Sequence, residues 1–165
     1  MSAYMTLMTP MTDRACLLAA LADLGFDASK VEVHEEPVHL RGFMGEARAQ
    51  VADVVIRRQH VGGSSNDVGF VRTSTGYQAV VSSYDQGRYG ERWLNALHGR
   101  YLVHLRAQEE RAAAEERRRL EEARQKLVEA QRQAVHARAK KMGYRVQEKR
   151  EGEVIRMVLV RRSYS

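Results

Sequence analysis

The chain has 165 residues, 29% of them charged, and a formal net charge of +6 at pH 7. This length suits one domain with an appendage, and two prolines argue against a disordered, proline-rich chain. The lone Cys16 excludes an intrachain disulfide and a cysteine-based zinc site, which favours a reducing compartment. Residues 1–12 lack the pattern of a secretory leader, and no apolar run approaches ~18 residues, so we predict a cytoplasmic protein without a membrane partner.

The positive charge is unevenly distributed along the chain. Residues 1–105 carry a net charge of −1, residues 106–141 carry +4 and residues 142–165 carry +3. A neutral body with a mixed-sign basic arm is a weaker sign of nucleic-acid binding than the isoelectric point of about 9.7 alone.

The first elements expected in the chain are a strand and a helix. Residues 4–9 alternate in polarity as a strand does. Residues 13–24 place leucines at helical spacing, and Gly25 follows where a helix end favours a positive φ. Thr12 or Asp13 would cap this helix, because their side-chain oxygens can accept from its first free N–H groups.

An antiparallel meander is expected next. A second strand around residues 31–40 should break at Pro37, and residues 51–61 form the strongest strand pattern. Two further strands, residues 67–72 and 77–83, are joined by a four-residue link. Because links this short cannot serve parallel neighbours, the strands should pair antiparallel.

Residues 106–141 are the most informative stretch, since they contain no Gly or Pro and interleave charges of both signs. They predict one long helix from about residue 91, roughly 75 Å long at ~1.5 Å per residue. A hairpin over residues 142–162 should return from it. We therefore expect a single α+β domain over residues 1–165: a mostly antiparallel sheet packed on the short N-terminal helix and on the base of the protruding charged helix.

Three interpretations of the long helix stay open. Its best contact seam comprises Leu120, Ala123, Leu127 and Ala130. A dimeric coiled coil needs bulky residues at this seam over three or more heptads, and only two leucines are present. A solvated or weakly docked helix is therefore favoured over a homo-oligomeric coiled coil, and direct contact with nucleic acid comes third.

Motifs for catalysis or cofactor binding are weak. No Cys, His or Asp cluster has zinc-ligand spacing, and Gly62-Gly63-Ser64-Ser65 lacks the lysine and the following helix of a P-loop. Asp53 within an apolar strand could be a buried base, although pairing with a neighbouring strand's arginine is commoner. We expect no catalytic residue, metal or cofactor.

Several blocks of the sequence together carry a family resemblance. They are Gly42-Phe43-Met44-Gly45, Ala52-Asp53-Val54-Val55-Ile56-Arg57-Arg58, Asn66-Asp67-Val68-Gly69-Phe70, Tyr84-Asp85 and Tyr89-Gly90 with Trp93-Leu94. In these blocks the chain resembles the hypothetical chloroplast open reading frame thirty-five family, which has no established activity. The likeness covers about residues 1–105 and 142–162, so residues 106–141 look like an addition.

The resemblance implies a candidate binding surface and a partner. The surface comprises Arg57, Arg58, Asn66, Asp67, Tyr84, Asp85 and Trp93. Because family members are often encoded beside an AAA-type ATPase, an accessory role in an ATPase-linked complex is implied. We expect a non-enzymatic adaptor whose long helix contacts a protein partner. The alternatives are a nucleic-acid-binding module using the basic helix and Arg-rich tail, and a small-molecule-binding or enzymatic domain with a pocket around Asp53, Arg57 and Asp67.

Overall fold

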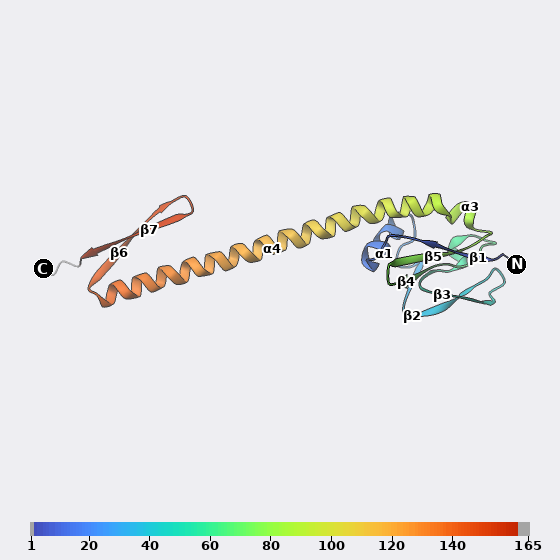
Figure 1. The fold of residues 1–165 in the computed structure, drawn as a ribbon, viewed down its shortest axis with the longest axis horizontal. Helices are drawn as coiled ribbons and strands as arrows, with labels where there is room; N and C mark the ends of the chain where they lie inside the picture. Colours follow the sequence, from blue (N-terminus) through green and yellow to red (C-terminus); the bar gives the residue numbers. More distant parts are fainter. Residues whose placement is uncertain (1, 162–165) are drawn as a thin grey trace. The chain divides into compact units, whose positions relative to one another are not determined.

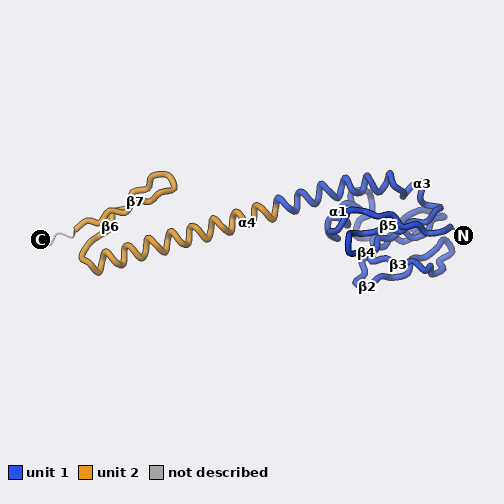
Figure 2. Tube along the Cα trace, in the orientation of Figure 1, with its two compact units in different colours: residues 1–110 blue, residues 111–165 orange. Residues whose placement is uncertain are grey.

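The computed structural model describes residues 2–161 and confirms the α+β fold class (Figure 1). The chain divides into two compact units, residues 1–110 and residues 111–165 (Figure 2). Unit 1 contains a five-stranded antiparallel sheet, and unit 2 contains a two-stranded sheet. The long helix α4 begins in unit 1 and ends in unit 2.

The elements of unit 1 are, in chain order, β1 (Tyr4–Met8), α1 (Arg14–Asp23), β2 (Val31–Arg41), β3 (Ala47–Ile56), α2 (Arg58–Val61), β4 (Val68–Thr73), β5 (Gly76–Ser82) and α3 (Gln86–Tyr89). Helix α4 (Glu91–Lys141) follows, and β6 (Tyr144–Glu151) and β7 (Val154–Arg161) complete the described chain. The large sheet has the strand order β1-β5-β4-β3-β2, and all its neighbours are antiparallel.

Helix α1 begins and ends where the sequence predicts. The Asp13 carboxylate caps it by accepting a hydrogen bond from the Cys16 N–H at 2.9 Å. Gly25 adopts a φ of 97°, which ends the helix at little steric cost. The hydroxyl of Tyr101 on α4 accepts hydrogen bonds from the N–H groups of Thr12 and Asp13 at 3.1 and 3.0 Å, so the base of α4 is tied to the start of α1.

Two strand predictions need correction. β2 is not broken at Pro37: it runs through the proline, and its pairing with β3 shifts register between Val33 and Val38. An edge strand tolerates proline, because the N–H groups on its outer side need no ladder partner. The register shift also spans Pro37, so the missing N–H breaks no regular pair there. The strand expected at residues 51–61 ends at Ile56 and gives way to α2, where the Arg58 N–H bonds a side-chain carboxylate.

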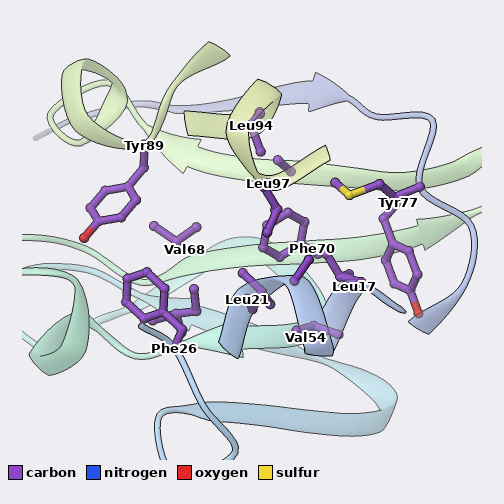
Figure 3. Close-up of a cluster of buried hydrophobic side chains, with 14 of the residues drawn as sticks. Leu17, Leu21, Phe26, Val54, Val68, Phe70, Tyr77, Tyr89, Leu94 and Leu97 are labelled. Carbon is purple, nitrogen blue, oxygen red and sulfur yellow. The ribbon is translucent and has the colours of Figure 1, made fainter. Parts of the chain in front are cut away.

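The main core lies between one face of the large sheet and the helices α1 and α4. Figure 3 shows Phe70 of β4 among Leu17, Leu21 and Leu97, and all four side chains are fully buried. An aromatic group extends this core, with the rings of Tyr89 and Trp93 5.1 Å apart in edge-to-face contact. The expected packing of the sheet on the first helix and on the base of the long helix is confirmed.

The opposite face of the sheet carries a smaller core built from strand residues. Its buried members are Leu40, Ala52, Val55 and Val80. Gly69 makes this packing possible, because a Cβ there would lie 2.5 Å from the Ala52 Cβ and 2.9 Å from a Leu40 methyl carbon. Tyr4 of the edge strand β1 bridges this face: its hydroxyl donates to the Asp67 carbonyl at 2.8 Å. The sheet is therefore curled, so that β1 meets the segment between β3 and β4.

Unit 2 is built differently, since it has almost no core. β6 and β7 pair over their full length, from Tyr144 opposite Arg161 to Glu151 opposite Val154. Among the described residues of this unit, Ala139 is the one buried hydrophobic residue. The hairpin expected near the end of the sequence is present, and it forms a sheet of its own.

Candidate binding surfaces

Asp67, at the start of β4, is a fully buried carboxylate that joins three segments of unit 1. Its Oδ1 accepts from the Arg58 N–H at 2.7 Å, and its Oδ2 accepts from the Arg41 N–H and from Nη1 of Arg57, both at 2.7 Å. These donors come from the ends of β2 and β3 and from the start of α2. With its oxygens occupied in this way, Asp67 fastens the sheet and is poorly placed to act as a base.

Arg57 completes this arrangement by bridging two carboxylates. Its Nε and Nη2 bind the Glu32 carboxylate side-on, the second at 3.1 Å, while Nη1 reaches Asp67. The hydrogen bond from Arg57 lowers the pKa of Glu32, and the two carboxylates raise the pKa of Arg57. Bidentate pairing of this kind holds Arg57 in one geometry. We call Glu32, Arg57 and Asp67 the arginine latch.

Asn66 and Asp85 form a second buried polar group with Ser82. The Asp85 Oδ2 accepts from the Asn66 N–H at 3.0 Å and from the Ser82 hydroxyl at 2.6 Å. The Asn66 side chain spans further, accepting from the Phe43 N–H at 2.9 Å and donating to the Ser82 hydroxyl at 3.0 Å. The Ser82 hydroxyl is thus bound on both sides and has the environment of a structural group rather than of a nucleophile.

A shallow apolar hollow of about 490 Å³ lies beside this second group. Phe43 and Met44 from the turn between β2 and β3, together with Tyr84, give it an exposed rim. Arg48 forms another wall, with its guanidinium 5.1 Å from the centre of the Tyr4 ring. Exposed aromatic and methionine side chains around a hollow suit contact with an apolar side chain.

A second hollow, of about 400 Å³, is polar and lies next to the arginine latch. Arg41, Arg58 and Gln59 line it together with the three latch residues and Gly45. Asp53 belongs to neither hollow; its Oδ2 accepts a hydrogen bond from the Arg72 N–H at 2.6 Å. The three residues expected to form one pocket are therefore separated, since Asp53 does not join Arg57 and Asp67. The Asp53 carboxylate instead accepts from a backbone N–H of β4, as a carbonyl of β3 would in a regular ladder.

The seven residues of the predicted surface fall into four environments. Arg57 and Asp67 share the arginine latch, with Arg58 at its rim. Asn66 and Asp85 share the second buried group, and Tyr84 is exposed at the apolar hollow. Trp93 lies apart from these, packed on Phe26, Phe70 and Tyr89 at the edge of the main core.

The predicted helix seam lies in unit 2. Leu120 and Leu127 are 60% and 61% exposed, and Ala123 and Ala130 are also exposed. The hairpin packs elsewhere on α4. Arg132 donates two hydrogen bonds to the Glu148 carboxylate of β6, at 3.0 and 2.6 Å, and Nε2 of His136 lies 2.7 Å from the same carboxylate. These contacts lower the pKa of Glu148 to about 2, and the hydrogen bond from Arg132 has the largest effect.

Sequence reasoning missed the hairpin–helix contact and the apolar hollow. In the sequence, Glu148 is one of several charged residues in a polar strand. It lies 16 residues from Arg132, and no local pattern predicts that the two side chains meet. Gly42-Phe43-Met44-Gly45 offered a usable signal, because two large apolar side chains between glycines at a turn have little chance of burial. Across residues 2–161, no group of three or more His, Cys, Asp or Glu side chains is placed to hold a metal ion. None of the helices in this range combines the length and the apolarity needed to cross a bilayer.

The fold and these sites define an α+β protein with a curled antiparallel sheet, internally paired polar groups and a long helix that ends in a hairpin. The chain belongs to the family described as a protein of unknown function (DUF1257), which it matches over residues 20–128. No curated protein and no solved structure matches it. The family match extends along α4 to residue 128, so the charged helix is not simply an addition from residue 106, contrary to our expectation.

Proposed function

We propose that the protein is a non-enzymatic adaptor whose unit 2 binds a protein partner. The observation that carries this proposal is the exposure of apolar side chains in a unit almost without a core. Leu120, Leu127, Val154 and Val158 are each 55–61% exposed. A two-stranded hairpin on a single helix is marginally stable by itself, so a partner surface would stabilise it.

The charge of unit 2 supports a partner of opposite sign. Residues 111–165 contain 16 Lys and Arg against 8 Asp and Glu, a net charge of +8, whereas residues 1–110 carry −2. Charge of this size speeds encounter with an acidic protein surface and disfavours other basic surfaces. An AAA-type ATPase complex is the partner class we propose, on the strength of the family resemblance alone.

The polar groups of unit 1 support the non-enzymatic part of the proposal. Asp67 is buried and accepts a hydrogen bond from Arg57, and Ser82 and Asp85 are buried and hydrogen-bonded to each other, so none of them is poised to react with a substrate. The hollow beside Tyr84 is open and rimmed by Phe43 and Met44, which suits a second protein contact more than the enclosure of a small molecule.

Affinity capture from native lysate tests the proposal. The baits are the full chain, the chain ending at Glu110, and the double variant Leu120→Gln/Leu127→Gln, which keeps good helix formers at both positions. We expect a partner set that the full chain retains and the shortened chain loses. Identical partner sets for the full and shortened chains would exclude a role for unit 2.

A nucleic-acid-binding module is the second candidate, and the charge of +8 on residues 111–165 is the observation in its favour. Several arginines of α4 are, however, paired with glutamates one turn earlier, such as Arg124 with Glu121 at 2.7 Å. Nucleic-acid binding would weaken steeply as salt rises, because bound counterions are released. Failure to bind duplex or single-stranded oligonucleotides at low salt would eliminate this candidate.

A further inference from the structure

The strand β7 has a free edge. Within the described residues it pairs only with β6, so the backbone groups on its other side have no ladder partner over eight residues. Natural proteins usually protect such an edge with proline, a short strand or several charges. β7 contains no proline, and six of its eight residues are apolar.

The sequence of β7 is that of an interior strand. Ile155 and Met157 share the face of Glu148, which the helix α4 engages through Arg132 and His136. Val154 and Val158, on the opposite face, stay 61% and 55% exposed. A strand that is apolar on both faces normally has neighbours on both edges and cover on both sides. β7 therefore resembles a strand from which one neighbour is missing.

The charges around β7 indicate which sign of charge the missing neighbouring strand should have. β7 has two arginines, Arg156 and Arg161, and no carboxylate. Glu148, on the neighbouring β6, is held by Arg132 and His136, and Glu151 lies 3.6 Å from Arg156. A second copy of the chain would bring another unit of net charge +8 against this edge. Like charges placed together disfavour that pairing, whereas an acidic strand complements the edge.

We propose that the free edge of β7 pairs with an extended, acidic strand of a protein partner, which becomes the third strand of the hairpin sheet. This inference rests on the proposed adaptor function and assigns its contact to β7 rather than to the Leu120–Leu127 seam. Backbone hydrogen bonds would supply the affinity, as in other complexes formed by strand addition. Val154 and Val158 would pack on apolar side chains of the added strand, and Arg156, which lies between them on the same face, would pair with a carboxylate of that strand.

The test uses the full chain labelled with ¹⁵N and a capped eight-residue peptide, Val-Thr-Glu-Thr-Val-Thr-Glu-Thr, in which valine and glutamate alternate along one face as Val154, Arg156 and Val158 do. We expect the peptide to slow amide exchange at alternate residues of β7. A peptide with lysine in place of glutamate should bind about ten-fold more weakly, because it meets a basic edge. A peptide N-methylated at its two central residues should also bind about ten-fold more weakly. Neighbouring N–H groups of a strand point to opposite edges, so methylating two in a row removes a hydrogen-bond donor from whichever edge of the peptide faces β7.

Two matched variants locate the contact on the protein. Val154→Thr/Val158→Thr keeps β-branched residues in the strand while removing apolar surface, and should weaken peptide binding about five-fold. Leu120→Gln/Leu127→Gln removes similar exposed apolar surface from α4 and should leave peptide binding unchanged. Equal binding of the N-methylated or the lysine peptide, or protection outside β7, would overturn the proposal. The proposal would also be overturned if sedimentation showed that the chain is a dimer and that the threonine variant is a monomer. Protection of the same β7 amides by an oligonucleotide would overturn it as well.

The same variants separate this inference from the adaptor proposal. Used as baits in the lysate capture, the threonine variant should lose the partner set and the glutamine variant should keep it. If only the glutamine variant loses the partners, unit 2 is still an adaptor but its contact is the helix seam. If the chain ending at Glu110 keeps every partner, the adaptor function of unit 2 itself is wrong.

Discussion

Asp67 shows how one side chain can hold several strand ends together. Its carboxylate is fully buried and takes hydrogen bonds from Arg41, Arg57 and Arg58. A charge in this position is tolerable only while its donors remain in place, because burying an uncompensated carboxylate costs several kcal/mol. The arginine latch therefore matters more to the stability of unit 1 than its place at the rim of a hollow suggests.

Removing the guanidinium tests this view of the latch. Arg57→Ala leaves the buried carboxylate of Asp67 without its cation, and we expect the free energy of unfolding to fall by about 3–5 kcal/mol. Urea unfolding measures the change. Arg92→Ala, at an exposed position on α4, is the control and should change the free energy by no more than about 0.5 kcal/mol. Equal effects of the two substitutions would show that the latch is not stabilising.

The close approach at Gly69 gives a second prediction at the scale of single residues. In Gly69→Ala the added methyl group would lie 2.5 Å from the Ala52 Cβ, a distance at which one strand must move. We expect a loss of about 1–3 kcal/mol, which is typical of an overpacked core. Gly63→Ala is the matched control, because its methyl group would meet nothing within 4 Å. A stability of Gly69→Ala equal to that of the control would contradict the packing of the smaller core.

At the scale of whole elements, the contact between β6 and α4 should depend on pH. The pKa of Glu148 is lowered to about 2 in the folded protein, against the ordinary 4.5 in an unfolded chain. A lowered folded pKa stabilises the folded form above the unfolded pKa. The stabilisation is therefore complete above about pH 4.5, and it is lost as pH falls from there towards about 2.

Carbon-detected NMR of the Glu148 carboxyl group, with amide exchange in β6, measures this effect. We expect titration well below pH 4 and a loss of β6 protection over the same range. Glu148→Gln removes the titrating group, so protection in this variant should not follow pH in that window. A Glu148 titration near its ordinary pKa of 4.5 would show that Arg132 does not hold it in solution.

How far the sequence predicts these elements depends on the range of the interactions that form them. The helix α1 was predictable because its cap at Asp13 and its end at Gly25 are local signals. α2 was not, because its start depends on Asp67, nine residues further along the chain and brought close by the fold. Pro37 was misjudged for a similar reason, since only the position of β2 at the sheet edge makes a proline acceptable there.

The candidate surface was predictable in composition but not in grouping. The resemblance identified Asn66, Asp67 and Asp85 as notable polar residues, and all three are buried and hydrogen-bonded. Their division into two separate polar groups depends on cross-strand contacts, which no spacing in one sequence reveals. The resemblance places Trp93 in the same surface, yet its ring packs against the main core in contact with the ring of Tyr89.

At the scale of the whole molecule, the two units differ in how they gain stability. The buried hydrophobic residues of unit 1 form two cores, all within residues 11–101, whereas unit 2 buries only Ala139 among its described residues. Burial of apolar area is the main favourable term in folding. Unit 1 should therefore fold without unit 2, whereas unit 2 depends mainly on the pairing of β6 with β7 and on polar contacts such as that of Arg132 with Glu148.

A chain ending at Glu110 tests this difference. It keeps Leu97 and Tyr101, and with them the hydrogen bonds from Thr12 and Asp13 to the tyrosine hydroxyl. We expect cooperative unfolding in urea, with a free energy within about 1 kcal/mol of that of unit 1 in the full chain. The fluorescence of Trp93, the single tryptophan, reports the transition, because its ring packs on this core.

A chain ending at Asn95 supplies the control, because it lacks both Leu97 and Tyr101. Losing two large, fully buried side chains costs at least about 3 kcal/mol each, which approaches the whole stability of a domain of this size. This shorter chain should show no cooperative transition. If the chain ending at Glu110 also fails to unfold cooperatively, the core of unit 1 depends on residues beyond 110. If both chains unfold alike, the base of α4 contributes less to the core than its burial implies.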